Sequence, residues 1–153
     1  MAVENPYEMA GAALIASSGC NVRKYRTSPT GTAYTQDDDW GIEVPRPRGP
    51  ISFGVFAHEV GHQLMHRSNS KPRWVEEVEA EEFALLAFAR FSLDGSEKYE
   101  RRAAEHLSYS FWKAVRRSER LLAVIPEAYP EWWPMVIATE TWSAKQLIER
   151  GAA

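Results

Sequence analysis

The chain of 153 residues contains one cysteine, Cys20, and this scarcity limits how the fold can be held together. One cysteine cannot form an intrachain disulfide, and it cannot build a metal cluster from several thiolates. The chain instead has six Trp, six Tyr and six Phe, which supply bulky side chains for an apolar core. We therefore expect a globular fold that is stabilised by its core.

The sequence also lacks long apolar runs and an excess of basic residues. No stretch approaches the roughly 18–20 apolar residues of a membrane-spanning helix, and 18 Lys and Arg against 21 Asp and Glu give a net charge of −3. Membrane and direct nucleic-acid functions are therefore not expected. The short apolar segment 10–16 follows Glu4 and Glu8 rather than basic residues, which argues against a signal peptide. We expect a cytoplasmic protein.

The order of residue types predicts one α+β domain over residues 1–153. Residues 21–50 are rich in Thr, Gly, Pro and Asp, which is typical of short strands joined by turns. From residue 51 onward the pattern is almost entirely helical. The expected architecture is a small antiparallel sheet packed on a mainly helical body.

Local signals give approximate bounds for the expected elements. Asn5 as N-cap, Pro6 at the first helical position and Gly19 as a stop signal define a first helix. Ser52 is expected to cap the second helix. Strands are expected at 22–25, 32–35 and 40–44, and later helices at 52–67, 72–93, 96–124 and 143–150, with Pro126, Pro130 and Pro134 as breaks between the last two.

A motif for metal chemistry lies on the second expected helix. Residues 58–62 read HEVGH, which fits the pattern HExxH. His58 and His62 are four residues apart, so a helix places them on one face about 6 Å apart along its axis, and both imidazoles can reach one zinc ion. Glu59 lies about 100° round the helix, beside the ion, where it can act as general base. The motif therefore predicts zinc ligands at His58 and His62 and a catalytic Glu59.

Other residues near this motif have weaker signals. His66 continues the four-residue series but cannot share an ion with His58, because eight residues of helix rise about 12 Å. We expect His66 at the helix end, which the helix dipole favours, or in contact with a metal ligand. Gly54 and Gly61 offer a small-residue flank where another element can approach closely. His106 lies on another helix, where it can be structural or line the cleft.

A catalytic zinc has three protein ligands and an open position, so a third ligand must come from elsewhere. The next expected helix carries a run of carboxylates. At about 100° per residue, Glu77 and Glu81 share a face with the alanines of that helix, which is expected to pack on the zinc helix. Buried carboxylates are costly unless paired or bound to metal. We therefore expect Glu77 as the third ligand and Glu81 as the partner of a ligand histidine, with Glu81 and Glu76 as alternative ligands.

These segments resemble the ImmA/IrrE family of gluzincin-type zinc metallopeptidases. HEVGHQLMH at residues 58–66 and EVEAEEFA at residues 77–84 are similar to the family patterns HExGHxxxH and E-x-x-A-N/D-x-F-A. The resemblance implies a zincin-like body, peptidase activity and Glu77 as third zinc ligand. Glu81 stands where the family pattern has Asn or Asp, which is a departure. Some family members act on or with helix-turn-helix repressors, so the resemblance implies a protein or peptide substrate of that kind.

Two classes of function are compatible with these residues. The first is a zinc-dependent endopeptidase, in which Glu59 is the base and another side chain donates a hydrogen bond to the oxyanion. The alternative is a non-proteolytic metal-binding protein with a regulatory or interaction role. Glu59 favours the first, because a purely structural metal site needs no general base. Candidate oxyanion donors are Tyr99, His106 and Tyr109.

Overall fold

The structure is a computed structural model that describes residues 3–36, 39–68, 70–140 and 142–151. It confirms the α+β fold, with helices predominant over a small sheet. The chain divides into two compact units, residues 1–99 and 100–153, and a single domain stays a prediction. The strands are β1 (Val22–Arg26), β2 (Thr32–Gln36) and β3 (Asp39–Pro45). The helices are α1 (Pro6–Ser18), α2 (Pro50–Met65), α3 (Arg73–Arg90), α4 (Ser96–Arg117), α5 (Leu121–Ala128), α6 (Trp132–Ile137) and α7 (Trp142–Glu149).

The sheet is mixed, and the expectation of an antiparallel sheet was wrong. Its strand order is β1-β3-β2, with β2 antiparallel to β3 but β1 parallel to it. β3 takes the centre because its Ile42 and Val44 are fully buried, whereas the polar β1 and β2 lie at the edges. Turn residues indicate where each strand ends, but they do not indicate which strands become neighbours in the sheet. The direction of pairing therefore depends on packing.

Helix α1 begins and ends where its local signals predicted. The side chain of Asn5 accepts hydrogen bonds from the backbone N–H groups of Tyr7 and Glu8, at 2.9 and 3.2 Å. Pro6 occupies the first helical position. Gly19 ends the helix with a φ of 70°, a left-handed conformation that glycine adopts without steric cost. The residues at the two ends of α1 thus determine where this helix begins and ends.

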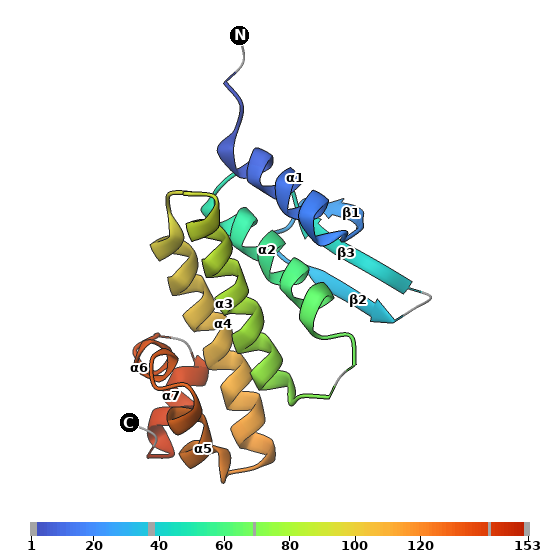
Figure 1. The fold of residues 1–153 in the computed structure, drawn as a ribbon. Coiled ribbons are helices and arrows are strands. Elements are labelled where there is room, and N and C mark those ends of the chain that lie inside the picture. Colours follow the sequence, from blue (N-terminus) through green and yellow to red (C-terminus); the bar gives the residue numbers. More distant parts are fainter. Residues whose placement is uncertain (1–2, 37–38, 69, 141, 152–153) are drawn as a thin grey trace. The chain divides into compact units, whose positions relative to one another are not determined.

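Helix α2 is central to the first unit and carries the predicted motif. The sheet lies on one side of it and α3 on the other (Figure 1). All residues from 53 to 63 are buried. The helix begins at Pro50, so Ser52 is not its N-cap. Ser52 lies in the first turn, where its hydroxyl accepts hydrogen bonds from the backbone N–H groups of Arg48 and Gly49. Because proline favours the first helical position, the helix starts two residues before the predicted start at Ser52.

The small residues of α2 allow close packing, as expected. A β-carbon at Gly54 would lie 1.8 Å from Cδ1 of Tyr99, and one at Gly61 would lie 3.1 Å from Cβ of Phe83. Helix α3 packs against α2, and its Ala80 is fully buried. This close approach brings the carboxylates of α3 within reach of the histidines of α2.

A polar anchor holds the sheet against the other side of α2. The amide nitrogen of Gln63 donates to the backbone carbonyl of Tyr34 on β2 and, at 3.1 Å, to that of Gly41 on β3. Gln63 is fully buried, so these hydrogen bonds replace those that its amide nitrogen would make to water. The anchor sets β2 beside the motif helix.

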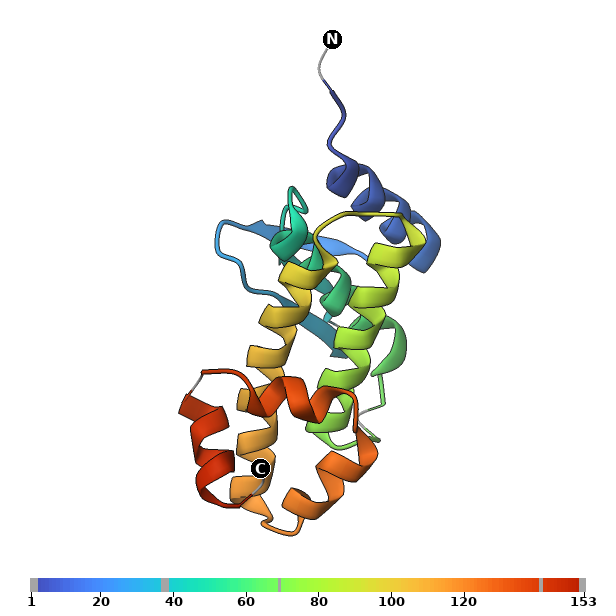
Figure 2. The same ribbon diagram turned by 90° about the vertical axis from the view of Figure 1, so that its left-hand side faces the viewer.

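The second unit consists of α4 from residue 100 onward and the short helices α5, α6 and α7, coloured orange to red in Figure 2. The predicted helix over 96–124 is two helices, because the chain turns between α4 and α5. Pro126 lies inside α5 rather than at a break. After this turn, Trp133 of α6 stacks on Phe111 of α4, with ring centroids 6.4 Å apart. None of the described helices is long and apolar enough to cross a membrane.

Candidate metal centre

The two motif histidines meet on the buried face of α2. His58 and His62 are only 6% and 3% exposed. Their Nε2 atoms lie 3.0 Å apart, because residues one helical turn apart point in the same direction. The Nε2 atoms of both histidines, which are of a type that can bind a transition metal, are therefore directed at one point.

Helix α3 supplies a carboxylate at the same point, as the helical wheel predicted. One oxygen of Glu77 lies 3.2 Å from Nε2 of His58, and the other lies 3.4 Å from Nε2 of His62. Glu77 is 4% exposed. The structure thus brings together the predicted set His58, His62 and Glu77 from two helices.

This set of donors fits a zinc ion in both chemistry and spacing. Two imidazoles and one carboxylate are a ligand set of catalytic zinc sites, which leave a fourth position open. With bonds of about 2.0–2.1 Å, tetrahedral ligand atoms lie roughly 3.3 Å apart. The two Nε2 atoms are 3.0 Å apart, and each lies 3.2 or 3.4 Å from its own oxygen of Glu77, which is close to that value.

A chain of buried polar contacts lies behind His58. Its Nδ1 is 2.8 Å from Oε1 of Glu81, which confirms that Glu81 contacts a motif histidine. The hydroxyl of Tyr99 donates to the other oxygen of Glu81 at 2.6 Å. Because Nδ1 of His58 faces a carboxylate, Nε2 is the nitrogen presented to Glu77. The hydroxyl of Tyr99, one of three candidate oxyanion donors, is thus directed at Glu81.

His66 lies at the end of α2, as expected, and contacts the second motif histidine. It is the C-cap residue, and its backbone N–H donates to the carbonyl of His62 at 2.9 Å. Its Nδ1 lies 2.8 Å from Nδ1 of His62. Both motif histidines therefore have a buried partner on the ring nitrogen that faces away from Glu77.

Arg73 is a site residue that the sequence did not indicate, and Glu76, predicted there as an alternative ligand, lies beside it. Arg73 donates to Glu77 at 2.7 Å and lies 3.7 Å from Glu76. The four-residue spacing of Arg73 and Glu77 is a signal that could have identified this pair. Glu76 is only 4% exposed. From the first turn of α3, Glu76 lines the pocket beside His62.

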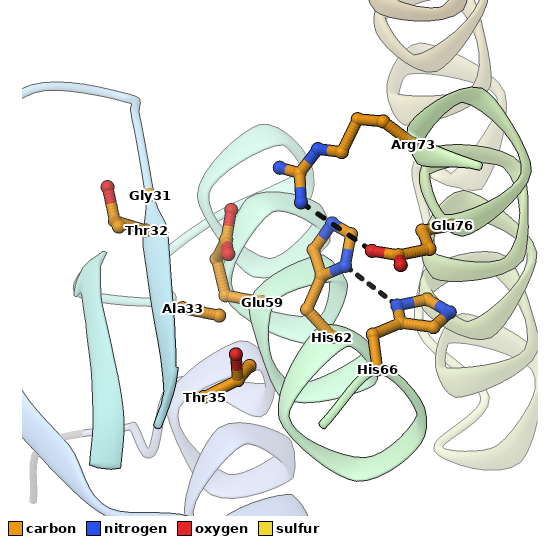
Figure 3. A pocket seen from close by; sticks show the side chains of 9 residues that line it. All are labelled: Gly31, Thr32, Ala33, Thr35, Glu59, His62, His66, Arg73 and Glu76. Carbon is orange, nitrogen blue, oxygen red and sulfur yellow. Dashed lines mark hydrogen bonds and ion pairs between the residues drawn. The ribbon is translucent and has the colours of Figure 1, made fainter. Parts of the chain in front are cut away.

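A cavity of about 150 Å³ opens beside His62, one of the three donors, and Glu59 lines it as well. Figure 3 shows Glu59 directed from α2 towards Gly31 and Thr32, with Arg73 and Glu76 on the far side of His62. Glu59 is absent from the donor set, as its position on the helix predicted. It therefore has a position from which it can act on a molecule in the cavity.

Burial and neighbouring charges together set the protonation of the site residues. Burial opposes protonation of His58, but the charge of Glu81 and the hydrogen bonds with Glu77 and Glu81 outweigh it and raise the pKa of His58 to about 10. Burial would raise the pKa of Glu77, but hydrogen bonds from His58 and His62 hold it well below its usual range. Burial lowers the pKa values of His62 and His66. A metal ion must therefore displace a proton from His58.

The remaining candidates, His106 and Tyr109, lie in the second unit, and their roles stay predictions. Comparisons with protein-family models, with curated proteins and with solved structures find no match to this chain.

Proposed function

We propose that this protein is a zinc-dependent endopeptidase. The observation that carries this proposal is the convergence of His58, His62 and Glu77 beside a cavity lined by Glu59. A site that only stabilises the fold would need the three donors but not a buried carboxylate beside them. The ImmA/IrrE-like motifs support the same reaction.

In this proposal, His58, His62 and Glu77 hold the zinc ion. When bound, zinc supplies a Lewis acid that polarises the scissile carbonyl and favours ionisation of water. Glu59 takes a proton from the attacking water and later delivers it to the leaving amine. Arg73 is oriented by Glu77 and keeps a positive charge at the cavity, where negative charge develops during the reaction.

Strand β2 supports a peptide as the substrate. Gly31, Thr32, Ala33 and Thr35 line the cavity, and β2 pairs with β3 alone among the described strands. An extended peptide can add to such a free edge through backbone hydrogen bonds. Pairing there would place its carbonyl groups near Glu59. The side chains of β2 that line the cavity are small and leave room for this approach.

The substrate class rests on the family resemblance and is part of the proposal. A helix-turn-helix repressor encoded beside this gene is the first substrate to test. Action on nucleic acid or at a membrane is not proposed.

The test separates metal binding from cleavage through Glu59→Gln. Glutamine is nearly isosteric with glutamate but cannot accept the proton of water, so we expect unchanged zinc content and a loss of cleavage by roughly 10²–10⁴-fold. Zinc content is measured by elemental analysis and cleavage by mass spectrometry of the repressor and of a peptide library. Glu82→Gln is the matched control, because Glu82 is exposed on α3.

Two results would contradict the proposal. If wild type and Glu59→Gln cleave equally, the activity comes from another source. If the protein binds zinc but cleaves nothing across the library, a non-proteolytic metal-binding regulatory protein becomes the better explanation.

A further inference from the structure

We propose that His66 is a positioning residue that fixes the ring of His62 for metal binding. This inference rests on the proposed zinc site and assigns a role to the last histidine of the series. His66 is too far along the helix to join His58 at one ion. It contacts His62 on the opposite side of the ring from Glu77.

The contact between the two rings specifies where their protons lie. Two nitrogens 2.8 Å apart form a hydrogen bond only if one carries a proton and the other offers a lone pair. Nε2 of His62 faces His58 and Glu77, so metal binding requires its lone pair there. Nδ1 of His62 must then carry the proton and donate it to Nδ1 of His66.

The surroundings of His66 favour the complementary arrangement. If Nδ1 of His66 accepts, its own proton lies on Nε2, which is 3.7 Å from a carboxylate oxygen of Glu79. That carboxylate is held by Lys71, whose Nζ lies 2.8 and 2.9 Å from its two oxygens. The negative charge of Glu79 thus favours a proton on the Nε2 side of His66. The side chain of His66 is 2% exposed, so water does not readily replace Nδ1 of His66 as the acceptor of the hydrogen bond from His62.

A second metal ion is the main competing use of these residues. His62, His66 and Glu76 also bring ligand atoms within 4.8 Å of one another. Such a site would need a lone pair on Nδ1 of His62 while Nε2 holds the first ion, which a neutral imidazole cannot provide. The geometry therefore favours one ion, with His66 as the support of His62.

The experiment compares the zinc affinity of wild type with two His66 variants by competition with a chelating dye. His66→Leu removes the acceptor and leaves the N–H of His62 buried without it, so affinity should fall about 10–100-fold. His66→Asn places a carbonyl oxygen near the former Nδ1 and should restore most of the affinity. Met65→Leu, at an exposed residue beside His66 that offers no metal ligand, is the control and should match wild type.

A spectroscopic measurement on wild type keeps the test independent of how the variants fold. In ¹⁵N-labelled, zinc-loaded protein, His62 should show a protonated Nδ1 and a metal-bound Nε2. Zinc ligation through Nδ1 of His62, two zinc ions per chain, or equal affinity in wild type and folded His66→Leu would overturn the role of His66 alone. Absence of zinc binding by wild type would overturn the proposed function, and the role of His66 with it.

Discussion

The backbone of Gly31 lies directly against the side chain of Glu59. A β-carbon at position 31 would be 2.6 Å from Cγ and 3.1 Å from Oε1 of Glu59. Gly31 immediately precedes β2, and Glu59 lies in the middle of α2. The absence of a side chain at one residue therefore leaves room for the proposed base at another.

Gly31→Ala should impair cleavage while leaving zinc bound. The new methyl group forces Glu59 to move, and a misplaced base loses part of the roughly 10²–10⁴-fold that such catalysis contributes. We expect at least about a tenfold loss of kcat/KM. Gly49→Ala is the matched control, because nothing lies within 4 Å of a β-carbon there. Equal rates for Gly31→Ala and wild type would show that Glu59 does not act from this position.

His58→Ala and His62→Ala should each abolish tight zinc binding. Two remaining protein ligands hold the ion poorly, since zinc sites of this type use three. Elemental analysis of the purified variants measures the loss, and Leu64→Ala, at an exposed residue of the same helix, serves as the control. A variant that keeps one zinc per chain would remove the mutated histidine from the set of ligands.

Glu77→Gln should weaken zinc binding far more than Glu79→Gln. Both oxygens of Glu77 face the motif histidines, whereas Glu79 contacts His66 and Lys71. Isothermal titration with zinc compares the two variants, which carry the same chemical change two residues apart. If Glu79→Gln loses more affinity, Glu77 is not the third ligand.

Tyr99→Phe should lower zinc affinity through Glu81. The ring keeps its place over Gly54, but Glu81 loses the 2.6 Å hydrogen bond that orients it towards His58. Losing a partner of a buried charged group costs about 1–3 kcal/mol, so urea unfolding should show lower stability as well. Tyr109→Phe, at a residue 48% exposed, is the control. Unchanged zinc affinity in Tyr99→Phe would mean that Glu81 needs no support from its hydroxyl.

Local spacing in the sequence predicted the part of the site that lies along single helices. The four-residue interval of His58 and His62 and the common face of Glu77 and Glu81 follow from 3.6 residues per turn. Once each segment is helical, these relations hold in almost any tertiary fold. The same reasoning explains why the caps of α1 were predicted correctly, since Asn5 contacts only neighbouring residues.

Packing between distant segments decided the rest. The parallel direction of β1, the contact of Gly31 with Glu59, and the hydrogen bond from Tyr99 to Glu81 join elements far apart in the chain. No local interval encodes such contacts, because they depend on which side chains fill the space between elements. The sequence by itself determined which residues on each helix can bind a metal. Only the tertiary structure decided which groups orient them, because those groups come from other elements.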